Sequence, residues 1–200
     1  MTIAVVDYGV GNLFSIKNAL ERIGARPTLI TEPESLTAFE GVVVPGVGSF
    51  GGCMRQLSRF EGVLRRALDE GTPILGICVG MQVLFDGSEE SPEEGLGWIS
   101  GDVIRLPDSV LVPQMGWNTL SIKKETEILE GISDEDFFYF VHSYACVPED
   151  RSVLAATTEY GLEIAAAVSR DNLFAVQFHP EKSGVEGLNI LENFVRFARC

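Results

Sequence analysis

Short runs of β-branched and aliphatic residues alternate with helix-like segments through the first half of this chain. We expect four of these runs to be buried parallel strands: Val5-Val6, Leu29-Ile30, Val42-Val43-Val44 and Ile74-Leu75. An apolar stripe at helical spacing runs from Leu13 to Ile23 and ends at Gly24, a residue type common just after helices. Because parallel strands need a crossover element between them, this alternation predicts an α/β fold, with a mostly parallel central sheet and helices on both faces.

The second half of the chain has more closely spaced apolar runs, at residues 137–141, 153–157, 164–168 and 173–178. This spacing predicts an antiparallel extension of the sheet, and we expect the aromatic run at 137–140 to lie in the core. Residues 86–112 are expected to be surface loop with a short strand at 103–106. We also expect helices at 54–68, interrupted near Gly62, at 79–85 and at about 188–198, all within one domain spanning residues 1–200.

Composition excludes several classes of function. The chain has 200 residues, a formal charge of −14, 46% hydrophobic residues and 22% charged residues. It is therefore long enough for a sizeable core and is not disordered by composition. The acidic balance argues against nucleic-acid binding, which needs clustered Lys and Arg. No apolar stretch approaches the roughly 20 residues of a membrane span, and we find no signal peptide. We expect a cytoplasmic protein with no nucleic-acid or membrane partner.

The four cysteines are widely scattered, at Cys53, Cys78, Cys146 and Cys200. No C-x-x-C pair indicates zinc or a redox couple, which agrees with a reduced, cytosolic protein. Residues 7–12 contain a G-x-G, but a dinucleotide-binding loop needs the longer G-x-G-x-x-G pattern. We therefore expect no metal and no cofactor.

Four unusual segments each follow a predicted strand. They are residues 7–12, Pro45-Gly46-Val47-Gly48, Cys78-Val79-Gly80 and His179-Pro180-Glu181. In a parallel α/β sheet, ligands bind outside the carboxyl ends of the strands. We therefore expect these four segments to gather at one edge of the sheet and to form a site there.

Cys78 is the candidate nucleophile of that site. It lies in Gly76-Ile77-Cys78-Val79-Gly80, directly after a strand-like run, and the flanking glycines fit a sharp strand-to-helix elbow. A helix N-terminus favours the thiolate form of such a residue. The alternative is that Cys78 is a small buried hydrophobic residue, the commonest state of a free cysteine. Three other cysteines lack this setting and are expected to be structural or incidental: Cys53, Cys146 and Cys200.

Only two histidines are available as a general base. His179 is followed two positions later by Glu181, and side chains at i and i+2 of an extended segment point the same way. Glu181 would then hold the imidazole in one tautomer and one orientation, as the third group of a triad does. The alternative is a surface turn without chemistry. We expect His142 to be a histidine of the core or of the pocket wall.

The segment Pro45-Gly46-Val47-Gly48 is a candidate for oxyanion binding. Its glycines allow backbone N–H groups to turn toward a ligand, and together with the N–H of Val79 they would form an oxyanion hole for a tetrahedral intermediate. The same glycines make the peptide easy to reorient, so the sequence leaves open whether the hole is preformed. An ordinary loop is the alternative.

Taken together, these motifs resemble those of the class I (triad-type) glutamine amidotransferases over nearly the full chain. The Cys78 elbow and Gln177-Phe178-His179-Pro180-Glu181 mark the broad family. Two further segments are similar to the glutaminase subunits of imidazole glycerol phosphate synthase: Asp7-Tyr8-Gly9-Val10-Gly11-Asn12-Leu13 and Met115-Gly116-Trp117-Asn118.

The resemblance implies a mechanism and a partner. Cys78 would attack the side-chain amide of L-glutamine to form a thioester, with His179 as acid and base and Glu181 orienting it. The residues implied to hold glutamine or its oxyanion are Gly46, Val47, Gly48, Val79, Gln82, Ser143 and Tyr144. Ammonia would pass to a (β/α)8-barrel cyclase subunit that closes an imidazole ring in histidine biosynthesis. The residues implied to face that partner are Asn12, Trp117 and Lys182.

One position departs from the pattern. Members of that subfamily usually carry Pro-His-Met-Gly-Trp-Asn, whereas this chain has Gln114 in place of the histidine. A neutral amide can form hydrogen bonds as an imidazole does but cannot titrate near neutral pH. Two alternatives stay open. One is the same triad in a glutaminase subunit of pyridoxal phosphate synthase or in a free-standing γ-glutamyl hydrolase. The other is a non-catalytic α/β binding module in which Cys78 is merely buried.

Overall fold

The computed structural model describes residues 1–199, and its centre is an eight-stranded sheet. The strands lie in the order β2 (Arg26–Ile30), β1 (Thr2–Val6), β3 (Gly41–Gly46), β4 (Ile74–Cys78), β13 (Leu173–Val176), β12 (Glu163–Arg170), β11 (Leu154–Glu159) and β8 (Ser121–Ile122). The first five strands are parallel, and the last three continue the sheet in antiparallel pairs. The predicted parallel sheet and its antiparallel extension are therefore confirmed. Cys200 lies outside the described residues.

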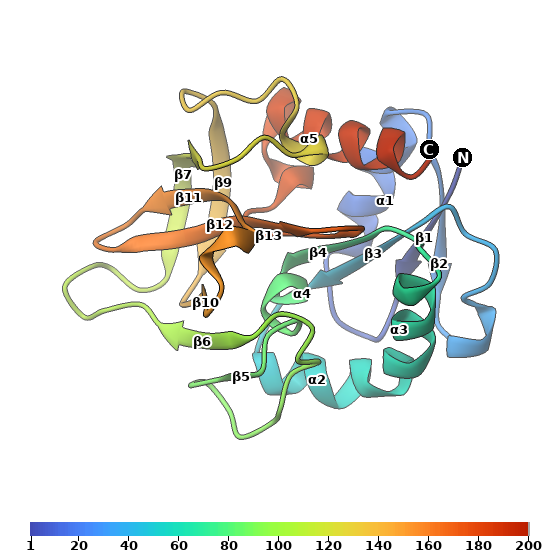
Figure 1. Ribbon diagram of the computed structural model, residues 1–200, viewed down its shortest axis with the longest axis horizontal. Helices are drawn as coiled ribbons and strands as arrows, with labels where there is room; N and C mark the ends of the chain where they lie inside the picture. Colours follow the sequence, from blue (N-terminus) through green and yellow to red (C-terminus); the bar gives the residue numbers. More distant parts are fainter. Residues whose placement is uncertain (200) are drawn as a thin grey trace.

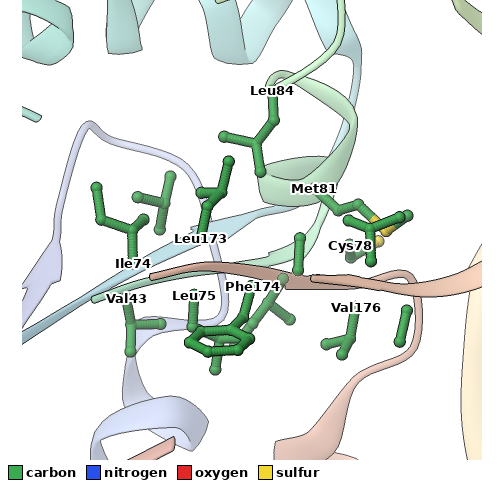
Figure 2. Packing of buried hydrophobic residues seen from close by; sticks show 14 of the residues in the cluster. Val43, Ile74, Leu75, Cys78, Met81, Leu84, Leu173, Phe174 and Val176 are labelled. Atoms are coloured by element: carbon green, nitrogen blue, oxygen red, sulfur yellow. The ribbon is translucent and has the colours of Figure 1, made fainter. Parts of the chain in front are cut away.

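Helices cover both faces of this sheet (Figure 1). The helices α1 (Leu13–Arg22) and α5 (Gly184–Phe197) lie on one face, and α2 (Phe50–Leu57) and α3 (Glu61–Asp69) lie on the other. Successive strand residues point to opposite faces, so Leu75 and Phe174 point to one side in Figure 2 while Ile74 and Leu173 point to the other. Phe174 also meets Phe194 of α5 edge-on, with 6.4 Å between the ring centres. The parallel strands β1, β3, β4 and β13 are thus buried on both faces. No helix of the described chain is long and apolar enough to span a membrane.

Two smaller sheets extend the antiparallel half of the molecule. One contains β10 (Tyr144–Pro148), β6 (Gly101–Arg105) and β5 (Gly87–Ser88), and the other pairs β7 (Gln114–Thr119) with β9 (Phe137–His142). The strands β5, β7, β8 and β10 were not predicted. They are short or contain Gly, Asn, Ser and Pro, which have low strand propensity, so only their pairing with neighbouring strands defines them.

The helices on the second face differ from the prediction in two ways. A 3-10 turn at Ser58–Phe60 separates α2 from α3, and Gly62, where we expected the interruption, lies inside α3. The hydroxyl of Ser58 bonds to a backbone carbonyl instead, a local interaction that competes with helix formation. The helix expected at 79–85 is only α4 (Val79–Gln82). It stops because the N–H groups of residues 96–99 occupy the carbonyls of Val83, Leu84 and Phe85.

Three burial predictions also need correction. The edge strand β2 is largely exposed, and Leu29 within it retains 40% of its accessible surface. The segment 86–112 is not simply surface loop, because it buries Trp98 and Ile99 against the core. The aromatic run at 137–140 alternates: Phe138 and Phe140 are buried, but Phe137 is 55% exposed. A two-stranded sheet packed on one face produces this alternation, since its other face has no layer to cover it.

The turn from β4 into α4 has a strained backbone that depends on its glycines. Cys78 has φ 57° and ψ −112°, a conformation rarely adopted by residues with a side chain. Gly80 lies so close to β3 that a Cβ there would stand 1.9 Å from the carbonyl oxygen of Val44. A Cβ on Gly46 would likewise stand 2.5 Å from the amide nitrogen of Gly80. The predicted elbow is therefore present, and close backbone contacts between β3 and α4 hold it.

We predict that Gly80→Ala destabilises the protein by about 3 kcal/mol or more, because the added methyl group overlaps a backbone atom that cannot move away. Gly62→Ala is the matched control, since a Cβ on Gly62 meets nothing within 4 Å. Replacing that helical glycine should stabilise α3 by about 0.5–1 kcal/mol. Urea unfolding of both variants measures the two effects. Equal stability of the two variants would contradict the close packing described here.

Candidate active site

A cavity of about 390 Å³ opens at the carboxyl ends of β3 and β4. Its walls come from segments that follow β3, β4 and β13 and from the connection between β9 and β10. The lining residues are Val47, Gly48, Cys78, Val79, Gln82, Glu90, Pro113, Val141, His142, Ser143, Tyr144, His179 and Lys182. Three of the four expected segments therefore converge. The fourth, residues 7–12, does not line the cavity but touches its wall through Tyr8, whose hydroxyl donates to the carbonyl of Pro45.

Cys78 stands at the junction of β4 and α4, on the wall of this cavity. Only 3% of its surface is exposed, so a reagent reaches the sulfur only through the cavity. The side-chain amide of Gln177 donates to Sγ at 3.7 Å, and Sγ lies 3.9 Å from the carbonyl oxygen of Val141. The imidazole of His179 lies close enough for the thiol to raise its pKa. The thiol is therefore buried, but polar groups surround it and form hydrogen bonds with it.

His179 and Glu181 form a closed pair beside that sulfur. Nδ1 of His179 lies 2.8 Å from Oε1 of Glu181, and both side chains are almost fully buried. Burial alone would lower the pKa of His179, but the hydrogen bonds and negative charges of Cys78 and Glu181 outweigh it and raise the pKa to about 9. Glu181 Oε2 is buried without a partner in the described chain. The carboxylate is thus directed at the imidazole alone.

The backbone that brings these two side chains together differs from the expectation. Residues Pro180–Lys182 form a 3-10 turn, not an extended segment, and His179 immediately before it is extended. The hydroxyl of Ser183 holds the turn by donating to the carbonyl of His179 at 2.6 Å. The spacing of two residues therefore brings the imidazole and the carboxylate into contact through a turn.

His142 lies on the cavity wall, as expected for a pocket histidine. Its Nδ1 is 2.8 Å from the carbonyl oxygen of Tyr144, which requires a proton on Nδ1. Burial lowers the pKa of His142 to about 4, and the nearby charge of His179 acts in the same direction. His142 is therefore a neutral imidazole at physiological pH. Gln114 is buried opposite it on β7, with its side-chain oxygen unpaired in the described part of the chain.

Most of the residues expected to bind glutamine line the cavity, but one does not. Val47, Gly48, Val79, Ser143 and Tyr144 line the cavity. Gly46 does not, because it packs against the backbone at the start of α4.

Gln82 also lines the cavity, but its amide nitrogen is engaged by the carbonyl of Tyr144 at 3.0 Å and by Gln177 at 3.1 Å. An amide has two N–H donors, so both donors of Gln82 are used and its carbonyl oxygen is left for a ligand.

Glu90 is a cavity residue that the sequence did not indicate. One of its oxygens accepts the backbone N–H of Phe50 at 2.6 Å, at the start of α2. Its neighbour Glu89 instead accepts from the backbone of Arg105. In the sequence the two glutamates form part of an acidic loop, and no feature separates them. Only the path of the chain after β5 brings Glu90 into the cavity.

The residues expected to face a partner lie near the mouth of the cavity. Lys182 lines the cavity, with its ammonium group 5.6 Å from the centre of the Tyr139 ring. Trp117 is 55% exposed and contacts Tyr139 edge-on. Met115 is also exposed, directly across from Val141 of the cavity wall. Asn12 precedes α1, and its side chain makes no capping hydrogen bond. No group of three or more metal-ligating side chains occurs among the described residues.

The family model for class-I glutamine amidotransferases matches residues 4–197 of the chain. The chain belongs to this family. Solved relatives agree in fold: a structure of PurLQS from Thermotoga maritima superposes with a TM-score of 0.80 at 19% identity, covering 98% of both chains. A second crystal structure, of a glutamine amidotransferase, gives 0.78 at 22% identity over 99% of both chains. The expected family and fold are therefore confirmed.

Closer relatives are found by sequence. The chain is 49% identical to the imidazole glycerol phosphate synthase subunit HisH of Methanothermobacter thermautotrophicus, covering 99% of this chain and 100% of the relative. It is 48% identical to the subunit of the same name from Aquifex aeolicus, covering 99% and 98%. The likeness to these subunits spans the full length of both proteins.

We predict that the two histidines titrate far apart, His142 near pH 4 and His179 near pH 9, in an NMR titration of their imidazole resonances. Cys78→Ala should lower the pKa of His179, because the thiol and its charge are among the groups that raise it. The raised pKa also means that protonated His179 stabilises the folded protein. This contribution to the free energy of unfolding is fully present below the unfolded pKa of about 6.5 and is lost as pH rises through about 9. Two similar pKa values near 6.5 would contradict the described geometry.

Proposed function

We propose that this chain is the glutaminase subunit of an imidazole glycerol phosphate synthase. It would hydrolyse L-glutamine to glutamate and ammonia and deliver the ammonia to a cyclase subunit. The observation that carries the proposal is that Cys78 and His179 line the same buried cavity while Glu181 bonds to the His179 imidazole. The full-length likeness to subunits of that name supports the choice of synthase.

In the proposed reaction, the Cys78 thiolate attacks the side-chain carbonyl carbon of glutamine, and the carbonyl electrons move onto its oxygen. With a pKa of about 9, His179 is an imidazolium near neutral pH. It can therefore give its Nε2 proton to the nitrogen that leaves as ammonia. The neutral imidazole then takes a proton from water, which attacks the thioester and releases glutamate. Glu181 keeps Nδ1 protonated throughout, so that Nε2 handles the proton transfers.

Two backbone N–H groups are the proposed oxyanion donors. That of Val79 belongs to the first residue of α4. That of Val47 makes no hydrogen bond with any described residue and is free to bind an oxyanion. Each such donor typically contributes a factor of about 10²–10³ to kcat, because the oxyanion needs it more than the ground-state carbonyl does.

Glutamine also carries an α-ammonium and an α-carboxylate. We assign the ammonium to the carboxylate of Glu90 and the remaining amide oxygen of Gln82, since both are acceptors on the cavity wall. The polypeptide around Ser143 and Tyr144 is assigned to the rest of the amino-acid head group. This arrangement would place the side-chain amide at the other end of the cavity, near Cys78.

The proposed partner is a (β/α)8-barrel cyclase subunit, and the proposed docking surface is the exposed face of β7 and β9. This face presents Met115, Trp117 and Phe137, which are all more than half exposed. Large apolar side chains that are exposed side by side on a protein surface commonly mark a site of protein–protein interaction. Met115 pairs with Val141 of the cavity wall, so a barrel seated here, also contacting Asn12 and Lys182, would receive ammonia close to where it forms. The cyclase would then make imidazole glycerol phosphate and AICAR in the cytoplasm.

We predict that Cys78→Ala reduces glutamine-dependent synthesis by the complex at least about 10⁴-fold, because the nucleophile is lost. Synthesis from added ammonium salt should stay within about twofold of the wild type, because the cyclase is intact. Both rates can be measured in one assay of imidazole glycerol phosphate formation.

Loss of the ammonia-driven rate as well would mean that Cys78 is structural. Full glutamine hydrolysis by the wild-type subunit without any stimulation by a cyclase would instead favour a free-standing hydrolase.

A further inference from the structure

The segment Pro45-Gly46-Val47-Gly48 is held by two side chains that lie outside the cavity. The hydroxyl of Tyr8 donates to the carbonyl oxygen of Pro45 at 2.5 Å. The thiol of Cys53, on α2, donates to the carbonyl oxygen of Val47 at a sulfur–oxygen distance of 3.5 Å. Both side chains are buried and neither lines the cavity.

These two contacts fix alternate peptide units. In a trans peptide the N–H points away from the C=O of the same unit. Holding the carbonyl of Pro45 therefore sets the direction of the Gly46 N–H, and holding that of Val47 sets the Gly48 N–H. The unit between them carries the N–H of Val47, which has no hydrogen-bond partner in the described chain. One unpaired N–H thus lies between two fixed peptide units.

Tyr8 and Cys53 must keep their protons in order to donate, and their surroundings ensure this. Burial raises the pKa of Cys53 to about 11 and that of Tyr8 well above its usual value. Each side chain also raises or lowers the pKa of the other, so the two lie close together. Cys53 is therefore a neutral thiol at physiological pH and does not compete with Cys78 as a nucleophile.

We propose that Tyr8 and Cys53 are positioning residues for glutamine hydrolysis, acting as a clamp on the segment Pro45-Gly46-Val47-Gly48. The Tyr8–Cys53 clamp confines reorientation of the segment to the peptide unit that carries the Val47 N–H. That N–H can then turn toward Cys78 as the oxyanion forms, without movement of the rest of the loop. This proposal rests on the glutaminase function proposed above.

Loss of the clamp should lower kcat more than it changes KM, because an oxyanion donor is needed mainly in the transition state. The test compares Cys53→Ser, which keeps a donor, with Cys53→Val, which fills the site without one. Cys146→Val is the matched control, since Cys146 is buried but its thiol makes no hydrogen bond to any described residue. Each variant is assayed for glutamine hydrolysis in complex with the cyclase.

We expect Cys53→Val to lower kcat about tenfold with KM within about twofold, less than the 10²–10³ lost with a donor itself. The kcat of Cys53→Ser should stay within about threefold of the wild-type value. The kcat of Cys146→Val should equal the wild-type value. Equal kcat values for Cys53→Ser and Cys53→Val would overturn the role of the clamp in turnover.

Hydrogen–deuterium exchange of a peptide spanning residues 45–49 provides a readout that does not depend on glutaminase activity. Exchange should be faster in Cys53→Val and unchanged in Cys53→Ser. Tyr8→Phe, which keeps the ring but loses the donor, should also speed exchange and replaces Cys53→Val if that variant does not fold. Unchanged exchange in the variants that lack a donor would overturn the clamp. A wild-type complex with no glutamine hydrolysis would instead contradict the proposed function, while the exchange data still decide the clamp.

Discussion

The close approach of the β3 and α4 backbones is the constraint on which this molecule depends. Gly46 and Gly80 allow the two elements to lie at a distance that any Cβ would prevent. This packing holds Cys78 at a positive φ, a conformation that costs about 1–3 kcal/mol and persists only where its surroundings enforce it. Because β3 and β4 are buried on both faces, they have little freedom to relax this strain. The energy of the core therefore maintains the geometry of the site.

The site combines a fixed sulfur with an adjustable oxyanion loop. A charged pair in a buried position is costly unless each charge has a partner, and here His179 lies between Cys78 and Glu181. The second histidine is kept neutral by burial. On the other side of Cys78, the loop after β3 contains one free N–H between two fixed peptide units. A partner that biases this one unit could regulate hydrolysis without disturbing the pair of His179 and Glu181.

Much of this arrangement could be predicted from the sequence, because its signals are local. The alternation of apolar runs predicts the parallel sheet, the glycines around Cys78 predict the elbow, and the spacing of His179 and Glu181 predicts their pairing. Features that depend on tertiary contacts could not be predicted. Glu90 enters the cavity through a loop whose sequence resembles solvated surface. The helix α4 ends early because the N–H groups of residues 96–99 occupy the carbonyls of the three residues that follow it. The clamp on Val47 joins Tyr8 and Cys53, which are 45 positions apart.

Chemical labelling shows whether Cys78, of the three cysteines that the structure describes, is the activated thiol. The complex is treated with a glutamine-analogue electrophile, and adducts are located by peptide mass spectrometry. We expect an adduct at Cys78 that forms at least about tenfold more slowly in His179→Ala, since a positioned base typically contributes a factor of about 10²–10⁴. An adduct at Cys53 or Cys146 that forms as fast as the one at Cys78 would contradict this expectation.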